Sequence, residues 1–456
     1  MRGITENELQ GRLFKITWPI FIDALLFMLL GSVDIFMLGK YSDNAVAAVG
    51  VVNQVMSMVN LLFGIITAGT MILCAQYIGA KKSKEEVIRL CGVSLGFNTF
   101  IGVILSFIMV ACGSIILKMM NIAPELMIYS KEYIKIVGGF TFVQSIAMTF
   151  TAISRSYGFT KLCMYVTLGI NIFNVMCNYV LIFGNLGAPE LGVIGAAIAT
   201  VLSKSIGAVV LGILIFRKVL KGFSLKHFRK FPIDELKSIL KLGLPAAGEQ
   251  ISYSLSKLVG TVILTLISIE AMTANSYINN ICMFVYLFSL SLGQGCSILV
   301  GQLVGKGDKD EAYNLCMWSL KRAILASAIL GSLVAVLGKD ILGLFTSNST
   351  VLAIGTSVLF INAILEPGRA VNLVIINSLR ASGDVKFPVY VGIISMWIVG
   401  VGVGYILSVP MGLGLVGIFI GLTLDEWIRG VIMYYRWKSR KWHTKILVTS
   451  NNEIIA

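Results

Sequence analysis

Residues Leu13–Gly39, LFKITWPIFIDALLFMLLGSVDIFMLG, are the stretch of sequence that decides the fold. The run is apolar and long enough for a helix to cross a bilayer, whose hydrocarbon core of about 30 Å needs about 20 residues. Two carboxylates, Asp23 and Asp34, lie inside it. A charge at this depth costs at least about 2.5–3.5 kcal/mol, so each carboxylate is expected to face a partner or a water-filled cavity. A separation of about three helical turns places both on one side of the predicted helix.

The whole chain has the composition of a polytopic membrane protein. Of its 456 residues, 57% are hydrophobic and 13% are charged, whereas about 25% of the residues of soluble domains are charged. We therefore expect an all-α fold. The first apolar run is too long for a signal peptide and no small-residue cleavage site follows it, so it is expected to stay in the mature protein. The apolar runs predict about twelve transmembrane helices, near residues 13–39, 50–78, 90–117, 131–155, 162–184, 191–216, 240–268, 272–303, 315–343, 352–380, 386–409 and 413–436.

The basic residues indicate how the chain is oriented in the membrane. The net charge is +14, and most Lys and Arg fall in the segments that share a side with the N-terminus. The longest of these, Arg217–Lys237, is strongly basic, while the opposite loop Asn185–Glu190 has no Lys or Arg. Lys and Arg accumulate in cytoplasmic loops, so both termini are expected in the cytoplasm. The charge therefore needs no nucleic-acid partner.

The second half of the sequence repeats the first. Four pairs of segments match in order, at offsets of 226, 226, 225 and 222 residues: Lys15–Pro19 with Lys241–Pro245, Gln76–Gly79 with Gln302–Gly305, Arg155, Lys161 and Tyr165 with Arg380, Lys386 and Tyr390, and Leu191–Gly195 with Leu413–Gly417. Six spans are an even number, so the two halves share one orientation and are parallel repeats. In transporters of this kind the substrate path lies at the interface of the repeats.

This duplication predicts the domain organisation. We expect an N-lobe at 1–216, a basic cytoplasmic linker at 217–238, a C-lobe at 239–436 and a cytoplasmic tail at 437–456.

The N-terminal half offers one candidate polar site. Asn171, Asn174 and Asn178 recur at helical spacing, so they line one face of the fifth span. Three amides in hydrocarbon are costly unless they are hydrogen-bonded. They are expected either to join helices or to form a shell around Asp34 that adjusts its protonation or supplies carbonyl oxygens to an ion.

The C-terminal half carries more charge in its spans. Glu366 with Arg369, and Asp425 with Arg429, are spaced to form ion pairs on one helix face. Glu249 and Asp23 occupy equivalent positions, each four residues after a proline. Glu249 and Lys257 do not share a helix face, so no ion pair is expected between them.

Several classes of protein and site are excluded. The only two histidines, His227 and His443, lie outside the spans, and no catalytic, cofactor-binding or ATP-binding motif is present. The eight cysteines show no metal-binding spacing. No charged ring or filter-like repeat supports a channel. Transport is therefore expected to be driven by an ion gradient or to be passive. No cofactor is expected.

The chain resembles the multidrug and toxic compound extrusion (MATE) transporters, of bacterial type, over essentially its whole length. The resemblance is carried by the segments GSVDIFMLG (31–39), QYIGAKK (76–82), NYVLIFGNLGAPELGVIGAAIAT (178–200), GLPAAGEQ (243–250), GQLVGKGD (301–308), ILEPGRAVNLVIINSLRASGD (364–384) and LDEWIRG (424–430). It implies two six-helix lobes around a V-shaped cavity in the bacterial cytoplasmic membrane. It also implies export of organic cations in exchange for H⁺ or Na⁺.

Individual site residues follow from this resemblance. Asp34 matches the first-span aspartate that binds the coupling ion in the N-lobe, Asn174 matches an asparagine of that pocket, and Asn178 replaces a second aspartate of many members. One carboxylate fewer weakens a Na⁺ site at Asp34. The C-lobe candidates for coupling or substrate binding are Glu249, Tyr253 (where other branches have the seventh-span glutamate), Glu366 and Asp425, with Asp23 and Lys257 as secondary candidates.

The leading hypothesis is an antiporter for amphipathic cationic small molecules that acts as a monomer. Protonation of Asp34, or ion binding there, would favour one conformation and expel the substrate. The alternative is a flippase of the same superfamily that moves a lipid-linked oligosaccharide or another amphipath. A flippase cavity is expected to carry Arg and Lys for phosphates, whereas acids outnumber bases in these spans.

Overall fold

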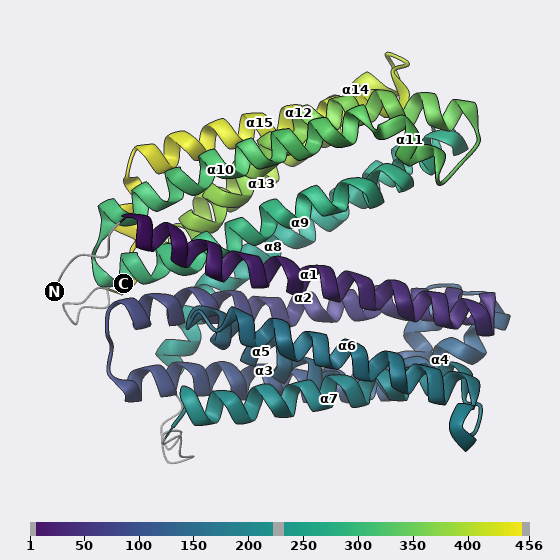
Figure 1. The fold of residues 1–456 in the computed structure, drawn as a ribbon, viewed down its shortest axis with the longest axis horizontal. Helices are drawn as coiled ribbons and strands as arrows, with labels where there is room; N and C mark the ends of the chain where they lie inside the picture. Colours follow the sequence, from purple (N-terminus) through teal and green to yellow (C-terminus); the bar gives the residue numbers. More distant parts are fainter. Residues whose placement is uncertain (1–5, 222–231, 449–456) are drawn as a thin grey trace. The chain divides into compact units, whose positions relative to one another are not determined.

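The computed structural model describes residues 6–221 and 232–448. The middle of the predicted linker, with His227, and the end of the predicted tail lie outside the described residues. Nearly all of the described chain is helical (Figure 1). The helices are α1 (Glu6–Tyr41), α2 (Asp43–Gly79), α3 (Lys84–Met119), α4 (Pro124–Gly139), α5 (Thr141–Ser156), α6 (Thr160–Phe183), η1 (Asn185–Gly187), α7 (Gly192–Lys218), α8 (Ile233–Thr265), α9 (Ile269–Lys306), α10 (Lys309–Val336), α11 (Gly338–Gly343), α12 (Ser349–Ala381), α13 (Lys386–Ser395), η3 (Met396–Val403), α14 (Gly404–Ser408), α15 (Gly414–Lys438) and η4 (Lys441–Lys445).

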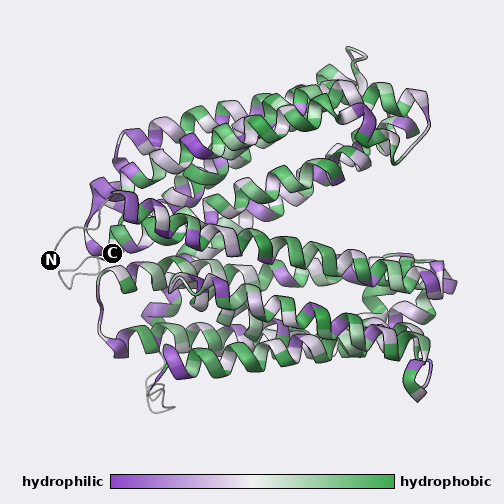
Figure 2. Cartoon of the chain, viewed as in Figure 1, coloured by the Kyte–Doolittle hydropathy of each residue, from purple (hydrophilic) through white to green (hydrophobic). Residues whose placement is uncertain are grey.

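The helices reproduce the predicted order of twelve spans. Within the described residues, nine helical segments are long and apolar enough to cross a membrane, and a bent pair, α4 with α5, makes a tenth. The two remaining spans, α8 and α15, are long enough but carry the charged groups that the sequence analysis singled out. Hydrophobic residues dominate the middle of the helices, and hydrophilic residues gather at their ends (Figure 2). The all-α membrane fold is therefore confirmed.

The bend between α4 and α5 coincides with a contact from another helix, α3. The helix axis changes direction by 49° between α4 and α5, around Phe140. The backbone N–H of Phe142 donates to the hydroxyl of Ser106 on α3 at 3.0 Å, in place of a carbonyl of its own helix. A side chain inserted into the backbone hydrogen-bond ladder is a recognised cause of a sharp kink.

The described chain forms two compact units. Unit 1 contains Met1–Phe21, Ala75–Lys81 and Leu244–Ala456, and unit 2 contains Ile22–Cys74 and Lys82–Gly243. Unit 2 therefore holds most of the predicted N-lobe, and unit 1 holds most of the predicted C-lobe.

The core of unit 1 joins the two ends of the described chain. Leu9 and Leu13 of α1 belong to the same buried cluster as Trp437 of α15 and Trp442 of η4. The two tryptophan rings stack at a centroid distance of 4.4 Å. The beginning of α1 and the last described residues consequently lie on one side of unit 1.

The two Gln-x-x-Gly segments of the sequence repeat meet inside unit 1. A Cβ atom added at Gly79 would overlap the carbonyl oxygen of Gln302, and one added at Gly305 would overlap the carbonyl oxygen of Gln76. The side-chain amide of Gln76 donates to the carbonyl oxygen of Ala381 at 2.7 Å. The glycines of both repeats thus allow two helix backbones to touch.

The core of unit 2 fixes the second half of α1 against its neighbours. Leu38 of α1 is 1% exposed and shares a cluster with Phe63 of α2, Ile134 of α4 and Ile182 of α6. This packing holds α1 beside α6, which is the arrangement that the candidate site requires.

Candidate functional site

The first candidate site joins α1 to α6 within unit 2. The side-chain amide of Asn178 donates to Asp34 Oδ1 at 2.6 Å and also lies 2.9 Å from Asn174 Oδ1. Asn174 and Asn178 are fully buried, whereas Asp34 is half-buried. The fold therefore brings together the acid and two of the three asparagines that the sequence predicted around it.

The third asparagine has a different role. The side chain of Asn171 donates to the backbone carbonyl of Leu26 on α1 at 2.6 Å. This bond joins α6 to α1 about two turns away from Asp34. The asparagine stripe thus serves both roles expected of it, since one member joins the two helices and two members surround the acid.

The pocket around Asp34 has a spare acceptor and a nearby positive charge. The Oδ1 atom of Asn178 is buried and has no hydrogen-bond donor among the described residues, and the same holds for the Oδ1 atom of Asn171 about two turns away. Lys204 of α7 and Tyr133 of α4 interact electrostatically with Asp34. Neither residue was predicted to be part of this site. Because Lys204 is the only basic residue well inside a span of the N-terminal half, its need for a partner was a usable signal.

The chemistry of this pocket suits a proton or a small hard cation. A carboxylate can take up a proton, and carboxylate and amide oxygens are the ligands that Na⁺ and similar cations prefer. In the described part of the chain, no group of three His, Cys, Asp or Glu side chains could hold a metal ion. Asp34 is the acid that the hydrogen bond from Asn178 places in this pocket.

Two ion pairs occupy equivalent positions in the repeats. Arg155 contacts Asp23 at 2.5 Å in unit 2, and Arg380 contacts Glu249 at 2.6 Å in unit 1. The two carboxylate side chains are only 10% and 13% exposed. The sequence predicted that the acids are equivalent and that the arginines are equivalent, but it did not pair them. Glu249, a predicted C-lobe candidate, is thus engaged with an arginine.

Tyr253 and Lys257 lie one and two turns beyond Glu249 on α8. Tyr253 is 37% exposed, and the ammonium of Lys257 lies 4.9 Å from the centre of its ring. As predicted from their angular separation, no Glu249–Lys257 ion pair is found in the described structure, because Glu249 contacts Arg380.

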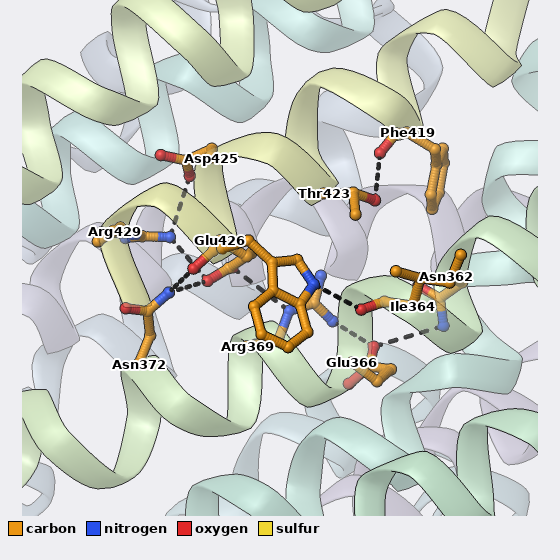
Figure 3. Close-up of polar contacts among 11 residues, drawn as sticks. Asn362, Ile364, Glu366, Arg369, Asn372, Phe419, Thr423, Asp425, Glu426 and Arg429 are labelled. Atoms are coloured by element: carbon orange, nitrogen blue, oxygen red, sulfur yellow. Dashed lines mark hydrogen bonds and ion pairs between the residues drawn. The ribbon is translucent and has the colours of Figure 1, made fainter. Parts of the chain in front are cut away.

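The most charged site of unit 1 links α12 to α15 (Figure 3). Glu366 contacts Arg369 at 2.6 Å, and Asp425 contacts Arg429 at 3.0 Å, which confirms both predicted pairs. Glu426 connects them, because it lies 3.6 Å from Arg369 and 2.9 Å from Arg429. The sequence analysis did not include Glu426 among the site residues, although it directly follows Asp425.

Amides and hydroxyls complete this network. Asn372 donates to Glu426 Oε2 at 2.7 Å, and Ser395 donates to Asp425 Oδ1 at 2.5 Å. Ser395 lies directly before η3, a stretch of π-helix, and such stretches occur often at functional sites. Glu366 is fully buried, and its Oε2 atom has no hydrogen-bond partner among the described residues. The three acids and two arginines leave one negative charge when all five are ionised.

The ion pair of unit 1 gives a first testable prediction. Replacing Arg380 with Leu is expected to destabilise the protein by about 2–4 kcal/mol, because Glu249 is left without its counter-charge. The effect is expected below that of a fully buried pair, since the Arg380 side chain is 23% exposed. The measurement is thermal unfolding of the purified protein in detergent.

A double variant separates pairing from packing. Arg380→Leu combined with Glu249→Leu is expected to recover most of the lost stability, because no unpaired charge remains. If the double variant is destabilised by the sum of both single changes, the two side chains are not energetically coupled.

Comparison with known proteins supplies independent information. A family model described as MatE matches the chain twice, over residues 19–180 and 245–406. The two matches are offset by 226 residues, which is the offset of the repeated sequence segments. The predicted internal duplication is confirmed.

Relatives of similar length cover nearly the whole chain. The uncharacterized transporter YisQ of Bacillus subtilis is 41% identical over 433 residues, covering 95% of each chain. A probable multidrug resistance protein NorM of Thermotoga maritima is 28% identical, covering 97% of this chain and 95% of its own. The bent form of the Vibrio cholerae MATE transporter VcmN has the same fold, with a TM-score of 0.88 at 17% identity over 96% of this chain and 99% of that one.

Proposed function

Because the chain belongs to the MATE family of membrane transporters, we propose that it is a secondary antiporter that exports amphipathic organic cations. We further propose that it works as a monomer in the bacterial cytoplasmic membrane with both termini in the cytoplasm. The relatives named as multidrug resistance proteins support an export function of this kind.

One observation carries the proposal. Asp34 is a half-buried carboxylate inside a membrane span, it accepts a hydrogen bond from Asn178, and the buried Oδ1 atom of Asn178 has no donor among the described residues. An ionisable group at membrane depth is by default part of a substrate or ion pathway. Asp23 has its own arginine, so Asp34 is the acid of the apolar run 13–39 that remains available for exchange.

The mechanism requires only that two ligands prefer different conformations. Uptake of the coupling ion at Asp34 neutralises the acid and weakens its electrostatic attraction to Lys204. This change favours one position of α1, while the organic cation binds the other conformation. Each ligand shifts the equilibrium between the two conformations only by the difference between its affinities for them. Binding of the coupling ion therefore disfavours the conformation that binds the organic cation, and the cation is released.

We propose H⁺ as the coupling ion. A Na⁺ site needs several oxygen ligands with enough negative charge, but Asp34 interacts with an amide, Asn178, and with a lysine, Lys204. A proton needs only the carboxylate. The amide of Asn178 donates to Oδ1, which leaves the second oxygen of Asp34 available for the proton.

The network of α12 and α15 is proposed as the C-lobe site for the cationic substrate. Its acids exceed its arginines by one, so one organic cation would make it neutral. Tyr286 lies beside Arg369, with the guanidinium 5.8 Å from the ring centre, and offers an aromatic face to a cation.

The test is transport in proteoliposomes that contain ethidium. An external pH lower than the internal pH is expected to drive ethidium out, whereas an inward Na⁺ gradient at equal pH is expected to have no effect. Export driven by Na⁺ alone would reject the proposed ion but keep the antiporter. No ethidium export under either gradient would reject export of organic cations and favour the flippase.

A further inference from the structure

The surface of unit 2 carries a groove that the proposed transport mechanism does not use. It lies between α5 and α7, has a volume of about 700 Å³, and is lined by eleven residues. Nine of these are apolar or glycine, and the other two are Ser205 and Arg217. This volume is within the range of about 300–1,000 Å³ that is typical of sites for small ligands.

Small residues and aromatic rings shape the floor of the groove. A Cβ atom added at Gly212 would lie 3.0 Å from the ring of Phe150, so a larger residue there would push into the floor. Phe150 packs edge-on against Phe216 at a centroid distance of 6.1 Å. Phe142, two residues after the break in the helix at Phe140, also lines the groove.

The groove opens to the surroundings of the helices. Val209 and Ile213 on its wall are 60% and 48% exposed. The hydroxyl of Ser205 donates to the carbonyl oxygen of Val201 at 2.7 Å, so this end of the groove demands no polar ligand. In a membrane, an apolar groove of this kind takes a hydrocarbon chain.

The opposite end of the groove is basic. Arg217 lines the rim and is exposed, and Lys218 follows it, with its ammonium 5.4 Å from the centre of the Phe159 ring. The sequence from 219 to 233 contains four more Lys or Arg and no acidic residue. The rise along α7 from Ser205 to Arg217 is about 18 Å, close to half of the bilayer core of about 30 Å.

From this arrangement we propose that the groove between α5 and α7 is a binding site for an anionic phospholipid. One acyl chain lies between Phe150 and Ile213, and the phosphate of the headgroup contacts Arg217. Basic pockets between transmembrane helices on the cytoplasmic side are suited to anionic headgroups. The apolar length and the position of the positive charge match the two parts of one lipid.

The test measures lipid binding to the full-length protein and needs no transport. Delipidated protein in detergent is mixed with equal amounts of phosphatidylglycerol and phosphatidylcholine that have identical acyl chains, and bound lipids are counted by native mass spectrometry. Phosphatidylglycerol is expected to be retained about fivefold more than phosphatidylcholine, which is the effect of one basic residue at the headgroup.

Two pairs of variants separate the headgroup contact from the acyl-chain contact. Arg217→Gln is expected to remove the preference, while Lys237→Gln, an exposed lysine at the start of α8, keeps it. Ile213→Trp is expected to lower the retention of both lipids, while Val210→Trp, which is exposed on α7 outside the groove, does not. All four positions are exposed, so the variants are expected to fold.

Equal retention of both lipids by the parent protein would overturn the proposal. So would equal loss of preference in Arg217→Gln and Lys237→Gln, because that result indicates unspecific attraction to a basic surface. Unchanged retention in Ile213→Trp would show that the bound lipids lie elsewhere.

Discussion

Asp34→Asn is expected to abolish export driven by a pH gradient. Asparagine has the same shape and keeps an acceptor for the amide of Asn178, so the contact between α1 and α6 is retained. It takes up no proton, and the two conformations of the variant then no longer differ in proton affinity at this position. A typical coupling free energy corresponds to about 5–150-fold, so gradient-driven ethidium export is expected to fall by about tenfold or more.

The matched control for this variant is Asp43→Asn. Asp43 is an exposed aspartate in the first turn of α2, and its replacement is expected to leave export unchanged. Binding of ethidium in the absence of a gradient is expected in all three proteins, which separates coupling from substrate binding. Export by Asp34→Asn at the parent rate would assign the coupling to another residue, with Glu366 as the next acid to change.

A charge exchange makes the test sharper. In Asp34→Asn combined with Asn178→Asp, the carboxylate moves across a hydrogen bond of 2.6 Å from α1 to α6. If the pocket needs a carboxylate at this location, the double variant is expected to regain part of the lost export. If the acid must be carried by α1, the double variant stays inactive, and the coupling depends on movement of that helix.

The order of the spans and the duplication could be predicted from the sequence. Apolar runs have few ways to satisfy their backbone in a bilayer, so hydropathy determines the helices. The repeat was visible because proline, glycine and arginine recur at nearly constant offsets. Local ion pairs, such as Glu366 with Arg369, were also predictable, since residues three or four positions apart share a helix face.

Contacts between distant helices were harder to predict. Arg155 and Asp23 are 132 residues apart, and their equivalence to Arg380 and Glu249 suggested a shared role without showing a contact. The bend at Phe140 has no proline to announce it, although Gly138 and Gly139 directly precede it, and the hydroxyl of Ser106 that accepts a hydrogen bond there lies on another helix. The groove beside α7 is lined by Phe142, next to this bend, and by Gly212, and neither feature changes the hydropathy pattern.

The glycines of the two Gln-x-x-Gly segments give the second large effect. Gly79→Ala and Gly305→Ala are each expected to destabilise the protein by about 3 kcal/mol or more. This is at or above the upper end of the usual cost of overpacking a core, which is about 1–3 kcal/mol. The added methyl group meets a backbone carbonyl of the other helix, and that carbonyl cannot turn away without breaking its helix. Thermal unfolding in detergent and the yield of monodisperse protein are the measurements.

Glycine-to-alanine substitutions at positions with free space around the Cβ are expected to stabilise the protein instead of destabilising it. Gly64 of α2 and Gly96 of α3 have no neighbouring atom within 4 Å of an added Cβ. Alanine in a helix interior is more favourable than glycine by about 0.5–1 kcal/mol, so Gly64→Ala and Gly96→Ala are expected to stabilise the protein slightly. Because Gly79 and Gly305 act at one helix crossing, the double variant is expected to lose less stability than the sum of the single changes. Additive losses would mean that the two glycines lie at independent contacts, and the repeated segment would then need another explanation.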